Sequence, residues 1–226
     1  MPLQNRVLPT GEIVAAPWRG HVMGNRGCLH RSDDTLGPAR WRHANWVACH
    51  IAFRGRHRLP MPPPGSPTVY TALFFWDEAA AFAAGHRPCG ECRNAAWRRF
   101  RALWEAAGLP GSGATGIDRT LQSARLSEGR GPRPHRRFQA AAASLPDGCF
   151  TIGETGPAVI LGDTCRPWDP AGGYGPPQAR PKGTVTVLTP EPIVAVLAAG
   201  YRPAIDAPLI DWAASRRGRW VGEGRR

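Results

Sequence analysis

Polar and hydrophobic residues alternate with a period of two along residues 46–58. This period is typical of a half-buried strand, in which successive side chains point to opposite faces. The pattern therefore predicts one strand that buries a cysteine among apolar residues and exposes arginines on its other face. The buried face would hold Val47, Cys49, Ile51 and Phe53, and the exposed face His50, Arg54, Arg56 and Arg58.

Two further strands and a helix are indicated in the same half of the chain. Residues 12–16 and the longer apolar run over residues 69–76 each predict a strand, the second more deeply buried. A helix is expected over residues 78–84, since Asp77 can cap its N-terminus and Gly85 suits the left-handed conformation that often ends a helix.

The rest of the chain carries a longer helix and a group of short strands. Trp97, Phe100 and Trp104 fall on one helical stripe, which predicts an amphipathic helix over residues 93–107. Thr189-Pro190 favours a further helix start, because threonine can cap a helix and proline suits its first turn. A short helix is expected over residues 117–126, and short strands over residues 149–152, 159–161 and 184–188.

The charge of the chain indicates an anionic partner. The chain has 226 residues, of which 42% are hydrophobic, so it can bury a core, and its formal net charge is +12. Nearly all the basic residues are arginines, because Lys182 is the one lysine. A GC-rich genome accounts for arginine in place of lysine but less well for the imbalance of charge. The composition therefore favours a polyanion such as DNA, RNA or an anionic membrane surface.

The cysteines are expected to work in a reducing compartment. No apolar run approaches the about 20 residues that a membrane-spanning helix needs, and residues 1–10 lack the apolar segment of a signal peptide. We therefore expect no membrane insertion and a cytoplasmic location. Six cysteines in that compartment indicate a metal site or reactive thiols rather than disulfides.

The pair Cys89-Gly-Glu-Cys92 is the sharpest chemical signal. Two thiolates at this spacing can bind one tetrahedral zinc ion, at about 2.3 Å each. A redox dithiol is the alternative, but such pairs usually belong to a βαβ unit, whereas this pair follows the end of a helix. Zinc needs two further ligands, for which we expect Cys28 and Cys49. The alternates are His30, His50 and His86.

These elements together predict an α+β fold. A small sheet and helices would surround a zinc knuckle, and a β-rich lobe would follow at the C-terminal side. The expected segments are a zinc-knuckle core over residues 1–107, an arginine-rich connector over 108–139, a small β-rich lobe over 140–205 and a basic tail over 206–226.

The stretch Phe74 to Arg93, FFWDEAAAFAAGHRPCGECR, resembles the second half of the Ada-type metal-binding domain. There an amphipathic helix ends in Ala-Gly-aromatic-Arg-Pro-Cys-x-x-Cys, four cysteines bind zinc, and one of them reacts with a methylated DNA phosphate. The resemblance implies zinc at Cys89 and Cys92 and a surface that faces DNA. That family has three residues between its first two cysteines, whereas twenty separate Cys28 from Cys49 here, which favours structural zinc over methyl acceptance. The full chain also resembles a group of bacterial proteins of similar length, which implies no activity.

The segment Pro88-Cys89-Gly90-Glu91-Cys92-Arg93 also resembles the zinc site of nucleoside and nucleobase deaminases. Those enzymes need a His-x-Glu or Cys-x-Glu upstream, in which the glutamate shuttles protons at the zinc-bound water. The candidate here is Cys49-His50-Ile51, with isoleucine in the place of that glutamate. A deaminase is therefore disfavoured.

Arginines of the alternating strand are the expected nucleic-acid surface. Arg54, Arg56 and Arg58 would project about 7 Å apart, close to the spacing of phosphates along a strand. Arg26 would join them from a loop between glycines, where the backbone can approach a ligand. A solvated face without a partner is the alternative.

The leading hypothesis is therefore a zinc-containing protein that binds nucleic acid, with DNA favoured, and that serves in DNA repair or modified-base recognition. The first alternative is a DNA repair enzyme that uses thiol transfer or glycosylase-type chemistry on a damaged nucleotide. The second is a zinc-stabilised adaptor for acidic proteins. For an enzyme, the candidate catalytic residues are Asn25, His30, Asp77 and Glu78.

Overall fold

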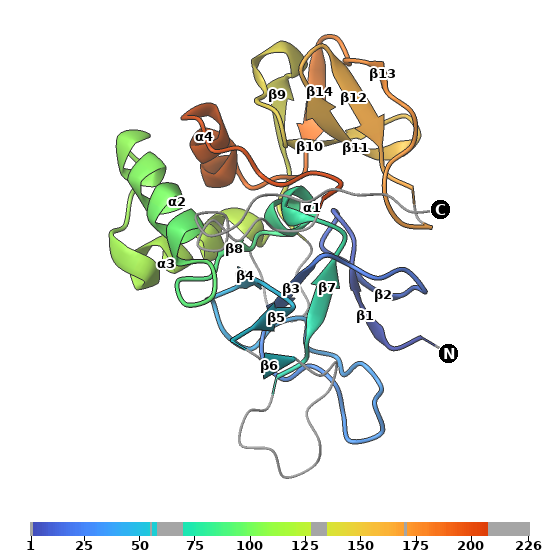
Figure 1. Ribbon diagram of the computed structural model, residues 1–226. Helices are drawn as coiled ribbons and strands as arrows, with labels where there is room; N and C mark the ends of the chain where they lie inside the picture. Colours follow the sequence, from blue (N-terminus) through green and yellow to red (C-terminus); the bar gives the residue numbers. More distant parts are fainter. Residues whose placement is uncertain (1, 55, 58–69, 128–134, 170, 208–226) are drawn as a thin grey trace, which may run out of the picture.

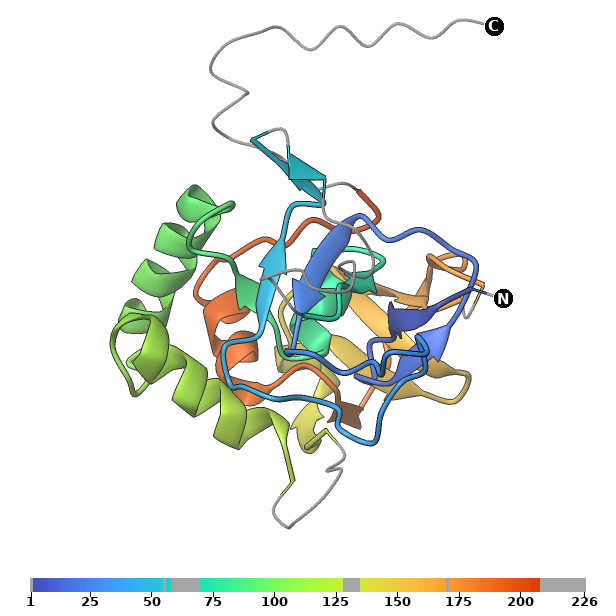
Figure 2. The same cartoon turned by 90° about the horizontal axis from the view of Figure 1, so that it is seen from below.

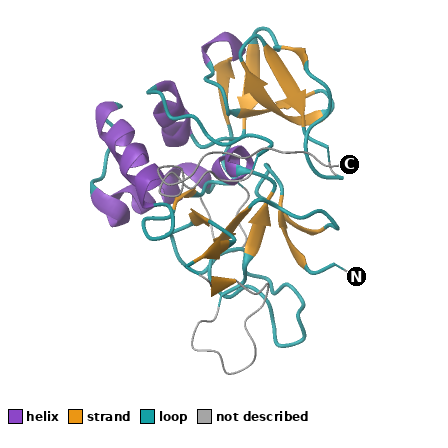
Figure 3. Cartoon of the chain, viewed as in Figure 1, coloured by secondary structure: helices purple, strands orange, loops and turns teal. Residues whose placement is uncertain are grey.

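The computed structural model describes residues 2–54, 56–57, 70–127, 135–169 and 171–207 (Figure 1). Within this part of the chain, two six-stranded sheets lie apart from each other, and the helices gather beside and between them (Figure 3). The predicted α+β class is confirmed, and so is a β-rich lobe on the C-terminal side. No helix of the described residues combines the length and the apolar composition needed to cross a lipid bilayer.

The first sheet is built from short strands of the N-terminal half, in the order β2-β1-β7-β3-β4-β8. Two of its neighbouring pairs, β1 with β7 and β4 with β8, are parallel, and the others are antiparallel. The strands expected over residues 12–16 and 69–76 correspond to the shorter β2 and β7. The bounds are β1 Gln4–Val7, β2 Ile13–Ala15, β3 Val22–Asn25, β4 Val47–Cys49, β7 Leu73–Phe75 and β8 Arg87–Pro88.

The prediction of one continuous strand over residues 46–58 is wrong. β4 ends at Cys49, and the chain then bends into a separate hairpin of β5 (Ala52–Phe53) and β6 (Arg56–His57). Arg54 has a φ of 51°, because it lies in the tight turn that reverses the chain. A period of two continues through a short hairpin, so alternation alone does not separate one strand from two. The hairpin lies at the edge of the molecule, away from the second sheet (Figure 1 and Figure 2).

Helix α1 (Glu78–Ala83) lies between the two sheets (Figure 1), and all of its residues are buried. Four of its six residues are alanines, whose small side chains allow both sheets to approach it. As predicted, Asp77 caps its N-terminus, accepting from the Ala80 N–H at 2.8 Å, and Gly85 follows in a left-handed conformation with φ of 81°. Ala79, Ala80 and Ala83 pack with Phe150 and Trp168 of the second lobe, and Ala81 and Ala84 with Leu73 and Phe75 of the first sheet.

The second sheet is antiparallel throughout, in the order β13-β12-β11-β10-β14-β9. The strands expected over residues 149–152, 159–161 and 184–188 correspond to β10, β11 and β14. The bounds are β9 Phe138–Ala141, β10 Phe150–Gly153, β11 Gly156–Leu161, β12 Thr164–Pro167, β13 Gln178–Ala179 and β14 Thr184–Val187, with a short 3-10 helix over Ala142–Ser144.

Three further helices pack together beside this sheet: α2 (Asn94–Ala106), α3 (Gly113–Arg125) and α4 (Glu191–Ala198). α3 lies within the segment 108–139 that was expected to be a connector, and its Ile117 and Leu121 are fully buried. α4 begins one residue later than expected. Pro190 is its N-cap, and Thr189 instead accepts from the Phe150 N–H at 2.9 Å. The shared core contains Phe82, Trp97, Phe100, Trp104, Ile117, Leu121, Cys149, Ile160, Val187, Ile193, Val196 and Leu197.

Candidate metal centre

Three cysteines meet where β4 ends and the chain turns from β8 into α2. β4 and β8 are parallel with Ala48 opposite Pro88, so the next residue of each strand is a cysteine. The N–H of Cys89 donates to the carbonyl of Ala48 at 3.0 Å, which fixes this register. The Sγ atoms of Cys49, Cys89 and Cys92 all lie within 4.8 Å of one another. We call these three residues the sulfur cluster.

The turn after Cys89 is held by the start of α2. The N–H of Arg93 donates to the carbonyl of Cys89 at 3.1 Å, and Nδ2 of Asn94 donates to the carbonyl of Gly90 at 2.9 Å. A Cβ at Gly90 would lie 3.3 Å from Cδ1 of Trp97, so this close approach of turn and helix favours glycine. The turn therefore brings Cys92 back close to Cys89.

The protons of the sulfur cluster are shared unequally. Hydrogen bonds from Cys49, and then from Cys92, lower the pKa of the Cys89 thiol far below its usual value. The hydrogen bond to Cys89 is the largest cause that raises the pKa of Cys49. At Cys92 the bond with Cys49 lowers the pKa, but the bond with Cys89 and burial outweigh it. The three residues thus favour one thiolate, on Cys89, which a divalent metal ion would convert to three by displacing two protons.

The donor set fits a soft or borderline metal ion, because thiolates are the ligands that zinc and similar ions prefer. A tetrahedral ion with bonds of about 2.3 Å holds its sulfur ligands about 3.8 Å apart, so it fits among atoms within 4.8 Å of one another after a small movement. The three cysteines are at most 9% exposed. They could therefore hold a metal ion that is shielded from water.

Only three side chains of the described residues form this group. A metal ion bound by three thiolates keeps one position for water or for a ligand, as catalytic zinc sites do. Apolar and aromatic side chains that are partly buried also pack against the sulfur cluster. They are Val47, Ile51, Phe53, Tyr70 and Phe74.

Cys28, expected as a ligand, lies elsewhere. β3 and β4 are antiparallel and pair Met23 with Cys49 and Asn25 with Val47. The chain that continues after Asn25 therefore runs past the opposite end of β4, away from Cys49. There the Sγ of Cys28 lies 3.7 Å from the carbonyl oxygen of His30.

The three alternate histidine ligands also lie outside the sulfur cluster. Nδ1 of His30 lies 3.1 Å from Oγ1 of Thr71, and the ring of His86 packs 4.5 Å from that of Phe75. His50 follows Cys49 directly and contributes its backbone, which forms a hydrogen bond that lowers the pKa of Cys92.

The candidate catalytic carboxylates have structural partners. Asp77 accepts from the Ala80 N–H, the Tyr174 hydroxyl at 2.6 Å and the Asp206 N–H at 2.9 Å. Burial is the main cause that raises its pKa. Both oxygens are used to tie α1 to the C-terminal segment, so the structure gives Asp77 a packing role.

Glu78 is likewise enclosed and is 2% exposed. It accepts from Arg93 at 2.5 Å, from the Tyr201 hydroxyl at 2.8 Å and from the Ala204 N–H at 3.0 Å. The remaining candidates, Asn25 and His30, lie near Cys28, and Oδ1 of Asn25 is 2.9 Å from Nε2 of His43. The four candidates therefore do not form one reaction centre.

The expected nucleic-acid residues are separated. Arg54 is exposed, and its guanidinium lies 5.0 Å from the Phe53 ring centroid. Arg56 lies in β6, and Arg58 lies outside the described residues. Arg26 is only 1% exposed, because it packs on Trp46 and donates to the carbonyls of Gly11 and Ala84. The prediction of one straight row of arginines is therefore wrong.

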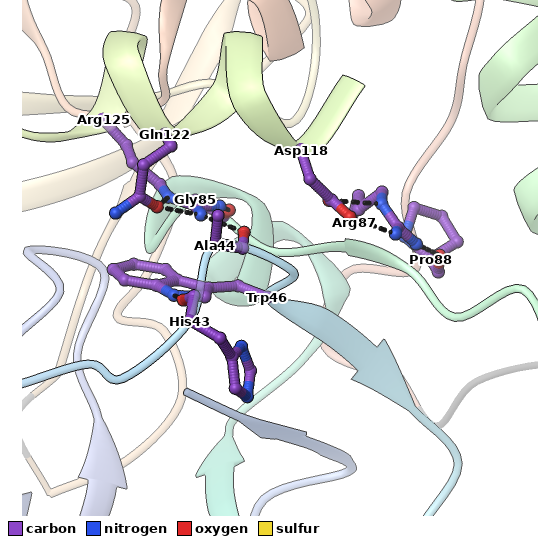
Figure 4. Close-up of polar contacts among 9 residues, drawn as sticks. All are labelled: His43, Ala44, Trp46, Gly85, Arg87, Pro88, Asp118, Gln122 and Arg125. Carbon is purple, nitrogen blue, oxygen red and sulfur yellow. Dashed lines mark hydrogen bonds and ion pairs between the residues drawn. The ribbon is translucent and has the colours of Figure 1, made fainter. Parts of the chain in front are cut away.

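Sequence reasoning missed a second buried polar group, at the opposite end of the β4–β8 pair. Trp46 precedes β4 and His86 precedes β8, and their ring centroids lie 5.3 Å apart. The guanidinium carbons of Arg26 and Arg125 lie 4.1 and 3.8 Å from the centroid of Trp46. The ring of His135 lies 5.8 Å away. We call Arg26, His86, Arg125 and His135 the cationic cluster; Figure 4 draws the Arg125 side of it.

No local signal in the sequence marks this cluster, because its members come from four separate segments. Arg125 ends α3, where it reaches across 81 positions to the carbonyl of Ala44. A basic residue in the last turn of a helix is also common for reasons of local electrostatics alone.

Searches against family models, curated proteins and solved structures found no match for this chain.

Proposed function

We propose that this chain is a zinc-containing protein that binds nucleic acid, with DNA favoured over RNA, and that it serves in DNA repair or modified-base recognition. The observation that carries the zinc assignment is the sulfur cluster, in which three buried Sγ atoms lie within 4.8 Å of one another. Three thiolates suit zinc better than magnesium or calcium, which prefer oxygen ligands. The zinc would hold β4, β8 and α2 together.

The nucleic-acid assignment is supported by charge. A formal net charge of +12 favours a polyanion. The exposed Arg54 lies in the hairpin that follows Cys49, close in sequence to the metal centre. DNA is favoured through the resemblance of residues 74–93 to the Ada-type domain.

A DNA repair enzyme is the second candidate, and the three-ligand donor set favours it. Zinc with three thiolates carries a net negative charge, and a metal-bound thiolate can act as a nucleophile at neutral pH. In alkyl transfer, a thiolate would attack the methyl carbon of a phosphotriester. The sulfur–carbon bond would form as the carbon–oxygen bond breaks, and the phosphodiester would leave with the electron pair.

Metal analysis together with DNA titration tests the leading proposal. We expect about one zinc per chain, lost in Cys92→Ser and retained in Cys28→Ser, because Cys92 belongs to the sulfur cluster and Cys28 does not. Affinity for single- and double-stranded DNA should fall as salt rises. Zinc without DNA affinity would favour the adaptor for acidic proteins, and the absence of zinc from the purified chain would remove the proposal's main support.

The enzyme candidate has a separate readout. After incubation with DNA that carries methyl phosphotriesters, intact-mass measurement should find one added methyl group per chain, mapped to one cysteine of the sulfur cluster. Unmodified protein with zinc retained would rule out thiol transfer and leave the binding function standing.

A further inference from the structure

The cationic cluster places positive charge in the interior, and among the described residues no carboxylate forms an ion pair with its two arginines. Arg26 and Arg125 are 1% and 0% exposed, and His86 is 0% exposed. Neither arginine takes part in the ion pairs formed among the described residues, where Arg87 pairs with Asp118 at 2.7 Å and Arg93 with Glu78 at 2.5 Å. Within the described part of the chain, the buried Arg87 and Arg93 are thus paired with carboxylates, whereas Arg26 and Arg125 form no ion pair.

Backbone carbonyls hold the two guanidinium groups in place. Arg125 donates to the carbonyl of Gly85 at 2.8 Å and also to that of Ala44 (Figure 4). Arg26 donates to Gly11 at 3.2 Å and to Ala84 at 3.3 Å. Carbonyl dipoles satisfy donors but supply only partial charge, so the burial of two full charges remains costly. Desolvation lowers the pKa of Arg26 to about 9.

Three buried nitrogen atoms of the cluster also have no hydrogen-bond partner among the described residues. They are Nε of Arg26, Nε2 of His86 and Nδ1 of His135. Buried polar atoms are nearly always paired in proteins, with protein groups, water or a ligand. The unpaired Nε–H of Arg26, beside a second buried guanidinium, therefore favours an anionic ligand.

A cavity of about 520 Å³ opens onto this group, and its wall includes Arg26 and His135. Arg40 and Arg137 add positive charge to the wall, and Glu12 adds one carboxylate. His135 lies tight against the loop on one side, since a Cβ on Gly11 would come within 2.3 Å of its ring. Arg26 and His135 of the cationic cluster thus share one cavity with Arg40 and Arg137, and these four residues come from three separate segments.

The remaining wall of the cavity suits a flat apolar group. Trp41, Ile13, Val14 and Leu126 line it. Its volume lies within the range of about 300–1,000 Å³ that holds organic ligands, which is much more than a lone inorganic anion needs. A ligand with a phosphate at one end and an aromatic ring at the other matches both parts of the wall, because base–aromatic stacking and charge-assisted hydrogen bonds are the usual means of holding a nucleotide.

We propose that this cavity binds a nucleotide, with its phosphate against Arg26, His135 and the two basic residues of the outer wall, and its base against Trp41 and the apolar wall. The nucleotide is either free or one unit of a nucleic-acid strand. Only the strand-borne form rests on the proposed nucleic-acid function. The site lies at the opposite end of β4 and β8 from the sulfur cluster, so it is separate from the metal centre.

Calorimetric titration of the full chain tests the proposal. The probes are the four common nucleoside 5′-monophosphates, the matching nucleosides, inorganic phosphate and a single-stranded DNA oligonucleotide. We expect at least one monophosphate to bind more tightly than both its nucleoside and phosphate. Equal binding of nucleoside and monophosphate, or of phosphate and monophosphate, would overturn the proposal.

Arg26→Gln risks unfolding the chain, so the informative variant is the double change Arg40→Gln, Arg137→Gln at the outer wall. It should weaken monophosphate binding by about tenfold or more, whereas the control Arg119→Gln, exposed on α3, should not. Unchanged affinity in the double variant would overturn the proposal.

The oligonucleotide separates the two sources of ligand. If the double variant weakens both monophosphate and oligonucleotide binding, the cavity holds a nucleotide of a strand; if only monophosphate binding weakens, it holds a free nucleotide. An oligonucleotide that fails to bind at all contradicts the proposed function but leaves the monophosphate result to decide the cavity. If no monophosphate binds and oligonucleotide binding is unaffected by the double variant, the cavity proposal is wrong.

Discussion

The two ends of the parallel pair β4–β8 carry buried polar groups of opposite character. At the C-terminal end, Cys49 and Cys89 follow the strands and join Cys92 in a group rich in potential negative charge. At the N-terminal end, Trp46 and His86 precede the strands, and two buried arginines pack on the indole. One end thus offers thiol ligands suited to a cation, and the other offers positive charge suited to an anion.

The buried ion pair of Glu78 and Arg93 can be compared with these two ends. Where α1 meets the C-terminal segment, Glu78 is buried with Arg93, and its oxygens also accept from Tyr201 and Ala204. In that network each charge has a partner of opposite sign within the chain. Because burying unpaired charge is costly, the two ends suit ligands from outside the chain: the sulfur cluster could hold a metal ion, and the cationic cluster would favour the proposed anion.

The largest expected effect is at the sulfur cluster. Cys89→Ser should abolish zinc binding and lower the free energy of unfolding by more than about 5 kcal/mol, because structural zinc contributes on the order of 10 kcal/mol to small zinc domains. Zinc analysis and thermal denaturation measure this. Cys28→Ser is the matched control and should keep its zinc; equal loss in both variants would contradict the three-cysteine assignment.

The next effect is at the centre of the cationic cluster. Trp46→Ala should lower the free energy of unfolding by about 4 kcal/mol, since it removes a fully buried indole and the surface on which two guanidinium groups pack. Denaturant unfolding of the zinc-loaded protein measures the loss. Trp41→Ala, at the more accessible cavity wall, should lower the free energy of unfolding clearly less. Similar losses of stability in the two variants would contradict the assignment of Trp46 as the centre of the cationic cluster.

A pH dependence of intermediate size should arise from the histidines of the cationic cluster. Desolvation, and then Arg26, hold the pKa of His86 and of His135 well below the usual 6.5. The unfolded chain therefore binds more protons below about pH 6.5, and stability falls as the pH is lowered from there, by up to about 1.4 kcal/mol per pH unit for each histidine.

His135→Asn isolates this effect. Its stability should fall less steeply than that of the wild type between about pH 7 and about pH 5, by up to about 1.4 kcal/mol per unit. Subtracting the variant's stability from that of the wild type at each pH cancels the contributions of other titrating groups. One of these is Asp77, because burial raises its pKa. Parallel profiles for the two proteins would mean that His135 keeps its usual pKa.

The smallest effect is expected for the exposed Arg54, which belongs to neither the sulfur cluster nor the cationic cluster. Arg54→Gln should change stability by less than about 0.5 kcal/mol, yet lower the slope of log affinity for DNA against log salt by about 1 if Arg54 contacts a phosphate. Arg119→Gln on α3 is the matched control. An unchanged slope would remove Arg54 from the proposed nucleic-acid surface.

Local chemistry in the sequence was enough for several elements. Asp77, Gly85 and the small residues between them predict the start, the end and the type of α1, because caps and propensities act within a few residues. The spacing of Cys89 and Cys92 likewise identifies a pair able to share a metal ion. The alternation of polar and apolar residues also correctly predicted that the side chain of Cys49 is buried among apolar residues.

Tertiary structure decided how distant segments meet. The parallel register of Ala48 with Pro88 brings Cys49 to Cys89, whereas the antiparallel register of Met23 with Cys49 carries Cys28 away. The turn at Arg54 ended a strand that alternation alone predicted to continue.

By itself, the sequence thus determined the α+β class, the principal helices and the cysteine pair, since these follow from periodicity, capping and spacing within short stretches. Only the tertiary structure decided which third cysteine joins that pair and that Arg26 and Arg125 pack on the same indole. These depend on strand pairing and on contacts between residues tens of positions apart, for which a single sequence carries no local signal.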